Sequence, residues 1–221
     1  LEKKNHEQEQ ELNQERLRFY TNITHELRTP LTLILGPLED MQKDTSLPTK
    51  QAQKLSVIHQ SALRLLNLIN QILEFRKTET QNKKLCVCKG NLTPLIHEIG
   101  FKYKELNQKP KIDFRIQTEK EEMLLFFDKE IITIILDNLI SNAIKYTEQG
   151  RVTLSLCQTT RNEVSYTEIK VSDTGYGISA EALPHIFDRY YQESGKHQAS
   201  GTGIGLALVR NLVELHEGDI R

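Results

Sequence analysis

A repeat of apolar side chains constrains what the first part of the chain can fold into. Leu55, Ile58, Ala62, Leu65, Ile69 and Ile72 follow one another at alternating spacings of three and four residues. This spacing is typical of a helix that packs against other helices along one seam, which Leu66 and Leu73 widen on one side. We therefore predict a long helix here that cannot be stable without helical partners.

The first partner is a second amphipathic pattern upstream. Its apolar residues form one stripe of a helix: Phe19, Ile23, Leu27, Leu31, Ile34, Leu38 and Met41. Pro30 lies inside this helix and favours a kink, because its ring removes one backbone hydrogen bond. Residues 44–48 are predicted to form the turn of an antiparallel hairpin. Only a second copy would bury so broad an apolar face fully, so we expect a homodimeric four-helix bundle.

His25 faces away from the apolar stripe. At about 100° per residue it lies roughly 160 to 200° from both Ile23 and Leu27, and therefore faces water. Glu26 is the next residue, and Thr29 lies one turn further along the same face. An imidazole beside a carboxylate and a hydroxyl is a candidate nucleophile. The alternative is an ordinary surface histidine, which is the commoner case for a lone residue.

The remaining N-terminal segments suggest a division of the chain. Residues 1–18 are charged and rich in glutamine, which fits either a connector that extends the coiled coil or a frayed, solvated helix end. Residues 78–84 are polar and are interpreted as a linker. We therefore expect a connector helix over 1–18, a helical hairpin over 19–79 and a second domain over 80–221.

Composition argues against several classes of protein. A formal net charge of −1 does not favour nucleic-acid binding. Cys86, Cys88 and Cys157 lack zinc-finger spacing, and we interpret Cys86 and Cys88 as packed on one face of a strand, reduced and cytosolic. No apolar run is long enough to span a membrane and no signal peptide opens the chain, so we expect a soluble piece. A membrane segment outside it stays open.

The apolar period changes after the linker. Strands are expected at 85–88, 112–116, 123–127, 151–157 and 167–171, and helices at 92–106, 128–146 and 204–216. This mixture predicts a two-layer α/β sandwich after the helical hairpin, so the fold class of the whole chain is α+β.

The second domain carries two motifs whose residues suit a nucleotide. Asn138, Asn142 and Lys145 share one helix face, where amide oxygens suit Mg²⁺ and an ammonium suits phosphate. Asp173 follows a strand and can accept a hydrogen bond from an exocyclic amine. The glycines that follow it let the backbone pass close to a flat base. Each motif alone is equally consistent with a structural role.

A third motif is rich in glycine and runs directly into a helix. In Gly201-Thr202-Gly203-Ile204-Gly205-Leu206, the free N–H groups of the helix N-terminus favour phosphate. It is not a Walker loop, because no Gly-Lys-Ser or Gly-Lys-Thr follows. The βαβ context of a dinucleotide-binding fold is also missing.

Together, and in this order, the motifs resemble those of a known family. Residues 19–38 resemble the phosphoacceptor box of sensor histidine kinases, and residues 138–206 resemble the N, G1, F and G2 boxes of their ATPase domain, which DNA gyrase shares. The amino-acid sequence around His25 is similar to that of hybrid two-component sensors of Bacteroidetes. The resemblance implies ATP-dependent autophosphorylation of His25, then phosphotransfer to an aspartate of a response-regulator receiver domain, with phosphatase activity as a further expectation.

The resemblance also implies roles for individual residues. His25 would be phosphorylated, Glu26 would orient its ring and take its proton, and Thr29 would position water during dephosphorylation. Asn142 would bind Mg²⁺ and Asn138 would support it. The other residues expected to bind ATP are Lys145, Tyr146, Asp173, Gly175, Gly177, Arg189, Gly201, Thr202, Gly203, Gly205 and Leu206.

Two departures from the family pattern matter. Gln192 stands where many members have an arginine that contacts the γ-phosphate, so that charge would come from Arg189, Lys196 or Lys145. Residues 192–200 are interpreted as a mobile lid. The chain also stops before the last strand or two of the family fold, so we expect an incomplete sheet edge.

The expected setting is the cytoplasmic portion of an inner-membrane sensor. Two alternatives stay open on the sequence alone. One is a dimeric signalling scaffold that binds nucleotide without transferring phosphate, and the other is an ATP hydrolase of the same nucleotide fold, which would leave the His25 helix unexplained.

Overall fold

The structure is a computed structural model, and it describes residues 2–43, 48–79, 84–107, 109–192 and 203–221. The chain divides into two compact units, Leu1–Lys83 and Lys84–Arg221. Most of the predicted turn at 44–48, most of the predicted linker and most of the predicted lid lie outside the described residues. No helix in the described ranges is both long and apolar enough to cross a membrane.

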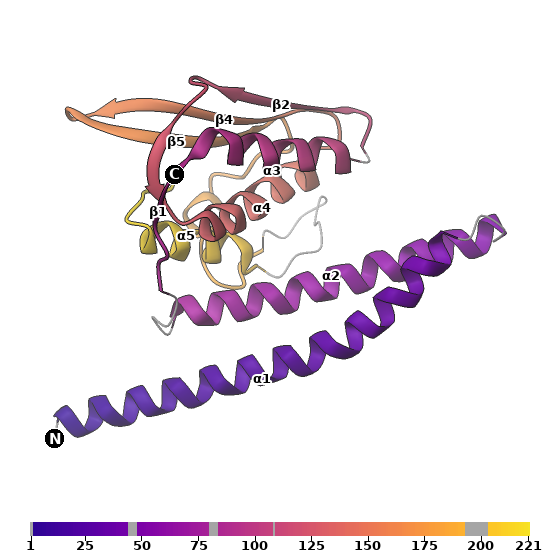
Figure 1. The fold of residues 1–221 in the computed structure, drawn as a ribbon, viewed down its shortest axis with the longest axis horizontal. Helices are drawn as coiled ribbons and strands as arrows, with labels where there is room; N and C mark the ends of the chain where they lie inside the picture. Colours follow the sequence, from indigo (N-terminus) through magenta and orange to yellow (C-terminus); the bar gives the residue numbers. More distant parts are fainter. Residues whose placement is uncertain (1, 44–47, 80–83, 108, 193–202) are drawn as a thin grey trace. The chain divides into compact units, whose positions relative to one another are not determined.

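The first unit is a hairpin of two long helices. They are α1 (Glu2–Gln42) and α2 (Thr49–Glu79). Pro30 and Pro37 both lie inside α1, which Figure 1 draws as one continuous, curved helix. Each proline ring removes one backbone hydrogen bond and crowds the carbonyl four residues earlier, so the helix bends without ending.

The hairpin buries only half of the predicted seam on α2. Leu55, Ala62 and Ile69 are buried, whereas three seam residues stay between 36% and 52% exposed. Those three are Ile58, Leu65 and Ile72. The seven-residue repeat therefore supplies two adjacent stripes, and only one of them is covered within the chain.

The predicted stripe on α1 is wrong in detail. Leu31 and Leu35 pack in the core of the hairpin with Ala62 and Ile69, whereas Ile34 stays exposed. Four predicted stripe residues, Ile23, Leu27, Ile34 and Met41, are between 36% and 50% exposed. Because the helices are antiparallel, these four residues and Ile58, Leu65 and Ile72 project to the same side of the hairpin. We call these seven residues the uncovered apolar face.

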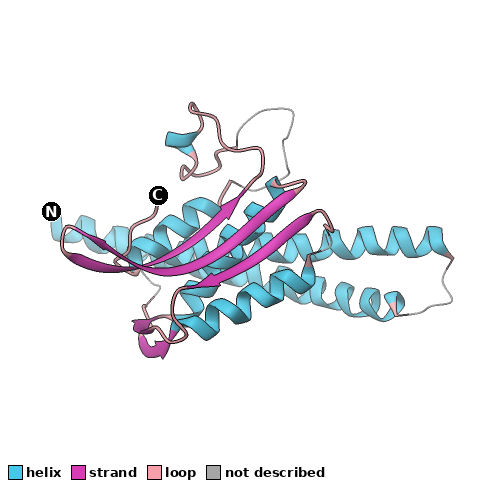
Figure 2. Cartoon of the chain, turned by 90° about the horizontal axis from the view of Figure 1, so that it is seen from above, coloured by secondary structure: helices cyan, strands magenta, loops and turns pink. Residues whose placement is uncertain are grey.

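The second unit is a sheet with helices on one face, which confirms the predicted two-layer α/β fold. The central strand β4 (Gly150–Arg161) pairs in parallel with β2 (Ile112–Thr118) and antiparallel with β5 (Val164–Asp173). Its helices are α3 (Leu92–Leu106), α4 (Lys129–Tyr146) and α5 (Gly205–Leu215). Figures 1 and 2 show the strands lying across these helices.

A smaller element lies beside this sheet. The short strands β1 (Cys88–Asn91) and β3 (Leu124–Phe127) form an antiparallel pair. A single 3₁₀ turn, η1 (Leu183–His185), follows β5. The main core forms between α3, α4 and the sheet, where alternate residues of β4 are fully buried. They are Val152, Leu154 and Leu156.

The predicted strand at 85–88 is wrong. Pairing begins only at Cys88, opposite Phe127, and residues 84–87 have no regular structure. The next residue along β3 is Asp128, which caps α4 and so ends the ladder. Cys86 and Cys88 are both exposed, which contradicts their interpretation as packed side chains.

Two further boundaries differ from those predicted. Thr78 and Glu79 belong to α2 and not to a linker, and the Thr78 hydroxyl donates to the Phe75 carbonyl at 2.7 Å. Polar composition alone does not end a helix. The β4–β5 hairpin is longer than predicted and turns at Asn162 and Glu163, which both have positive φ. A pair of left-handed residues suits the twist of a tight hairpin.

Asp128 joins three segments of the second unit. Its Oδ1 accepts from the Ile131 amide at 3.1 Å and caps α4, while its Oδ2 accepts from the Cys86 amide at 2.8 Å. The Asp128 amide itself donates to Nε2 of His216, at the end of α5, at 3.1 Å. One buried carboxylate therefore fixes the entering chain and the start of α4 together.

Replacing this carboxylate should destabilise the second unit. Asp128→Ala leaves the buried Ile131 amide and the Cys86 amide without their acceptor, which we expect to cost about 2–4 kcal/mol of unfolding free energy. Urea unfolding followed by circular dichroism measures the loss. The matched control is Asp113→Ala, which removes only exposed ion pairs with Arg115 and Arg151 and should cost less than about 1 kcal/mol. Equal midpoints for the two variants would contradict this role.

Candidate functional site

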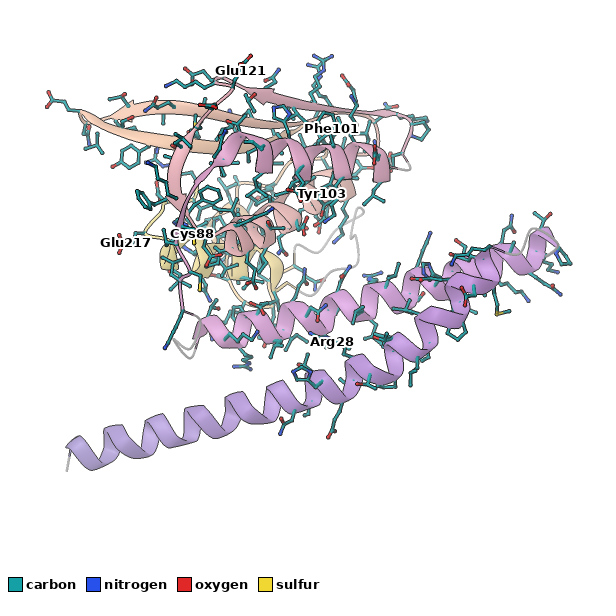
Figure 3. All side chains as sticks on the ribbon, viewed as in Figure 1. Arg28, Cys88, Phe101, Tyr103, Glu121 and Glu217 are labelled. Atoms are coloured by element: carbon teal, nitrogen blue, oxygen red, sulfur yellow. The ribbon has the colours of Figure 1, made fainter. Side chains whose placement is uncertain are left out.

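His25 is held on the water-facing side of α1. The residue before it, Thr24, is buried, and His25 itself is exposed. One turn later Arg28 faces α2 (Figure 3), where its Nη2 donates to Oδ1 of Asn70 at 2.7 Å. No sequence pattern predicts this contact, which fixes the rotation of α1 around His25.

The neighbours predicted for His25 lie beside it. Glu26 and Thr29 are both exposed on the same helix. The Thr29 hydroxyl donates to the carbonyl of His25 at 3.1 Å, which leaves its oxygen able to accept a hydrogen bond from water. Pro30 has no N–H, so the Glu26 carbonyl lacks its usual helical donor. The imidazole thus stands beside a helical turn that has one backbone hydrogen bond fewer than a regular turn.

Two amides of α4 lie on one face, as predicted, but in different surroundings. Asn138 is buried, and its Nδ2 donates to the Ile134 carbonyl at 2.8 Å. Its Oδ1 points at the start of α5, since a Cβ on Gly205 would lie 2.9 Å from that oxygen. Asn142 is half-buried, and its side-chain amide makes no hydrogen bond to any residue that the structure describes. The second amide is therefore the one placed to meet a ligand.

A cation lies against an aromatic ring at the end of α4. The ammonium of Lys145 is 4.7 Å from the centre of the Tyr146 ring and 3.2 Å from its hydroxyl. Such a pair holds the lysine in place while its charge stays accessible.

The loop after β5 packs directly on the end of α4. The Tyr176 amide donates to the Tyr146 carbonyl at 3.3 Å, and a Cβ on Gly175 would lie only 2.4 Å from that carbonyl oxygen. Gly175 also donates to Oδ1 of Asp173 at 2.9 Å, which orients this exposed carboxylate. Gly177 has a φ of 74°, a conformation that glycine adopts without strain. The predicted amide helix and Asp-Gly loop are thus brought together.

The glycine-rich motif is described only from Gly203 onward. Gly203 has a φ of 68°, and its carbonyl accepts from the Tyr190 amide at 2.9 Å. Gly205 begins α5, no side chain at Ile204 caps that helix, and Leu206 is half-buried. Arg189 is exposed beside this contact. Gly201, Thr202 and Lys196 lie outside the described residues.

Sequence reasoning missed a contact that ties this loop to the turn after α4. Tyr176 forms a side-chain hydrogen bond with Glu148, and this bond is the main reason why the pKa of Tyr176 is raised. Some burial of the phenol and the negative charge of Glu148 raise that pKa further. Tyr176 lies inside the predicted Asp-Gly motif but was given no role there, and Glu148 belongs to no predicted motif, so the sequence offered no signal for the pair.

Comparison with known proteins identifies both halves of the chain. Residues 127–221 match the family described as histidine kinase-, DNA gyrase B- and HSP90-like ATPase. Residues 15–81 match the His Kinase A (phospho-acceptor) domain.

The relatives are much longer than this chain. Histidine kinase P4 of Formosa agariphila is 37% identical over 100% of this chain and 16% of its own length. Hybrid signal transduction histidine kinase D of Dictyostelium discoideum is 33% identical over 97% of this chain and 14% of its own length. The chain therefore spans only a small part of the curated relatives that it matches.

Solved structures agree with the fold. Full-length ShkA in complex with AMPPNP superposes with a TM-score of 0.69 at 25% identity, over 90% of this chain and 41% of that chain. The histidine kinase AdeS of Acinetobacter baumannii superposes with a TM-score of 0.56 at 22% identity, over 86% of both chains, and supports the fold alone.

The contact between Tyr176 and Glu148 can be tested by titration. Glu148→Gln removes the charge that holds the phenolic proton, so the pKa of Tyr176 should fall toward its ordinary value near 10. The Tyr176 ring resonances, followed by NMR from pH 8 to about 12, report this pKa. Glu163→Gln, at the tip of the β4–β5 hairpin, is the matched control and should leave the titration unchanged. An unchanged Tyr176 pKa in Glu148→Gln would show that the loop is not held by this side chain.

Proposed function

Because the chain belongs to the sensor histidine kinase family, with its phospho-acceptor and ATPase domains, we propose that it phosphorylates His25 from ATP. The phosphoryl group would then pass to an aspartate of a response-regulator receiver domain. One observation carries the proposal: the same chain holds an exposed histidine in the first domain and, in the second, contacts that bring the helix α4 together with the loop after β5 and the start of α5.

The chemistry assigned to His25 follows from its surroundings. A ring nitrogen attacks the γ-phosphorus of ATP, a new N–P bond forms, and the bond to the bridging oxygen of ADP breaks. Glu26 orients the ring and takes the proton from its other nitrogen. The exposure of both side chains lets a separate ATP-bearing domain reach them. In the reverse role, the Thr29 hydroxyl positions water when the phosphorylated partner is hydrolysed.

The ATP-binding residues divide between base and phosphates. Asp173 accepts a hydrogen bond from the adenine amino group, with Gly175, Gly177 and Tyr146 shaping the pocket. Lys145, whose ammonium lies over the Tyr146 ring, would approach the phosphates. The start of α5 offers backbone N–H groups to the phosphates, together with the glycine-rich segment before it. The phosphate-binding residues proposed there are Gly201, Thr202, Gly203, Gly205 and Leu206.

A cation must replace the arginine that many family members carry where this chain has Gln192. Arg189 is our candidate, because it is exposed next to the Tyr190–Gly203 contact at the start of the glycine-rich motif. Lys145, whose ammonium lies over the Tyr146 ring, is the alternative that the described residues offer.

The residues of α4 fit a bound Mg²⁺. Asn142 would be the protein ligand, and the fixed amide of Asn138 would support it. In the described part of the chain, no three His, Cys, Asp or Glu side chains gather into a metal site. Mg²⁺ commonly takes few protein oxygens and fills its shell with phosphate and water, so one amide ligand suffices. When bound, the ion would neutralise charge on the phosphates.

We infer a homodimer from the uncovered apolar face. The face carries seven half-exposed apolar side chains at heptad spacing, a surface that a soluble helix pair does not leave in water. His25 lies on the opposite side of α1 from Ile23 and Leu27, so a second copy would leave it accessible. Other relatives are named sensors, such as the sensor histidine kinase WalK of Bacillus subtilis, and we propose by analogy that the parent protein is an inner-membrane sensor with this part in the cytoplasm. The receiver domain could lie in the same polypeptide, as in relatives named hybrid kinases.

A charge on the uncovered apolar face should separate the two copies. Leu65→Glu places a carboxylate at the centre of the face, where burial against a partner would cost several kcal/mol, on the order of 3 or more. Sedimentation velocity should show a dimer for the native chain and a monomer for the variant. Val57→Glu, on the same helix but off the face, is the control and should stay dimeric. A dimeric Leu65→Glu would rule out this face as the interface.

Labelled ATP tests the central proposal. The native chain with γ-labelled ATP and Mg²⁺ should acquire an acid-labile, base-stable label, as a phosphohistidine does. His25→Gln should lose the label because the acceptor nitrogen is gone, and Asn142→Ala should lose it because the Mg²⁺ ligand is gone, each by about a hundredfold or more. His97→Gln on α3 is the control and should keep the label. Nucleotide binding without label in the native chain would favour the alternative, a binding scaffold.

A further inference from the structure

The connection between α3 and β2 holds Lys109 in a fixed position. Asn107 brackets it, since its Nδ2 donates to the Lys109 carbonyl at 3.2 Å and its Oδ1 accepts from the Lys109 amide at 3.1 Å. The Lys109 carbonyl also accepts from the Ile112 amide at 3.0 Å. Both backbone groups of Lys109 are therefore engaged, and the direction of its side chain is set by the turn.

The Lys109 side chain ends at the C-terminus of α4. Its ammonium donates to the carbonyl of Ile144 at 2.7 Å and to that of Thr147 at 2.9 Å, and lies 3.4 Å from that of Lys145. The last carbonyls of a helix have no partner within it, and a cation there also meets the negative end of the helix dipole. Lys109 is half-buried, so its ammonium occupies a place that water would otherwise take.

The carbonyl that Lys109 does not take belongs to the nucleotide site. In this run of four residues, the Tyr146 carbonyl accepts from the Tyr176 amide, and Gly175 packs against the same oxygen. Lys109 thus holds the carbonyls on either side of the one that carries the Asp-Gly loop. Any rotation of the Tyr146 peptide would move this loop and, through the Gly175 amide, the Asp173 carboxylate.

We propose that Lys109 is a positioning residue for nucleotide recognition. It fixes the end of α4, so that the Tyr146 carbonyl holds the Asp-Gly loop in place. The loop in turn keeps the Asp173 carboxylate in position to accept a hydrogen bond from the adenine amino group. The inference rests on the proposed function, because it takes adenine as the ligand of Asp173. Lys109 touches no substrate itself, so its removal should weaken recognition of the amino group without abolishing the hold on phosphate.

Inosine triphosphate is the probe for this role, because it is close to ATP in shape but lacks the exocyclic amine. The ratio of the Kd values for inosine triphosphate and ATP measures recognition of that amine by isothermal calorimetry with the full chain. Lys109→Met should weaken ATP binding by about three- to tenfold and leave inosine triphosphate almost unchanged, so the ratio falls. Lys111→Met, two residues on and exposed, is the matched control and should keep the native ratio.

The ratio separates positioning from folding. A general loss of folded protein would weaken the binding of ATP and of inosine triphosphate by the same factor and leave the ratio of their Kd values unchanged. A native ratio in folded Lys109→Met would therefore overturn the inference. If Lys109→Met does not fold, Asn107→Ala gives the same readout, because it frees the Lys109 backbone but keeps the ammonium; its ratio should fall by a smaller factor, and a native ratio there overturns the inference equally.

Asp173→Asn separates failure of this inference from failure of the proposed function. A native chain that prefers ATP and an Asp173→Asn variant that does not would uphold Asp173 as the reader of adenine. A native chain with no preference for ATP would overturn both that role of Asp173 and the inference on Lys109.

Discussion

The hydrogen bond from the Tyr176 amide to the Tyr146 carbonyl is the contact on which the second unit's site depends. It joins the end of a core helix to a loop that has no regular structure of its own. The core side of α4 is buried through Leu136, Ile140 and Ala143, so the position of its last turn is set by packing. A rigid helix can therefore fix an exposed carboxylate at the end of β5, and Gly175 is required because the carbonyl leaves no room for a Cβ.

In the hairpin, apolar side chains must serve two contacts, one between its own helices and one with a partner. A seven-residue repeat on two helices yields more apolar surface than one antiparallel contact can cover, so the hairpin keeps a covered stripe and an uncovered one. The covered stripe and the Arg28–Asn70 hydrogen bond set how α1 is rotated. That rotation places His25 away from both stripes, so helix packing and the proposed phosphorylation use separate faces of α1.

Elements with a strong apolar period could be predicted from the sequence, and contacts made by single polar atoms could not. Both long helices, α3, α4 and the sheet strands follow from such periods, and the motif residues on α4 and after β5 lie where the motifs predicted. The choice between Ile34 and Leu35 failed because both suit the same helical period and only the partner helix decides. The strand near Cys86 failed because four residues are too few to show a period.

The missed contacts share a physical cause. Lys109, Glu148 and Arg28 bind groups that are distant in sequence or belong to the backbone. Every lysine, glutamate or arginine has the same capacity to form hydrogen bonds, so the residue type alone does not mark these three. Their partners come within reach only when the helices and loops are in place, so no sequence pattern predicts these contacts. Contacts of this kind fix orientation more than they add stability, because each exchanges a hydrogen bond with water for one with protein.

Pro30 gives the turn around His25 a mechanical property that a regular helical turn lacks. The Glu26 carbonyl has no helical donor, so bending the helix there breaks no backbone bond at that position, whereas the same bend in a regular turn would stretch one. α1 runs without interruption from its charged N-terminal segment into this turn. A displacement carried along the helix axis from the N-terminal segment therefore reaches the Pro30 turn before the Pro37 turn, and it changes the direction of the helix beside the side chain whose exposure the proposed chemistry requires.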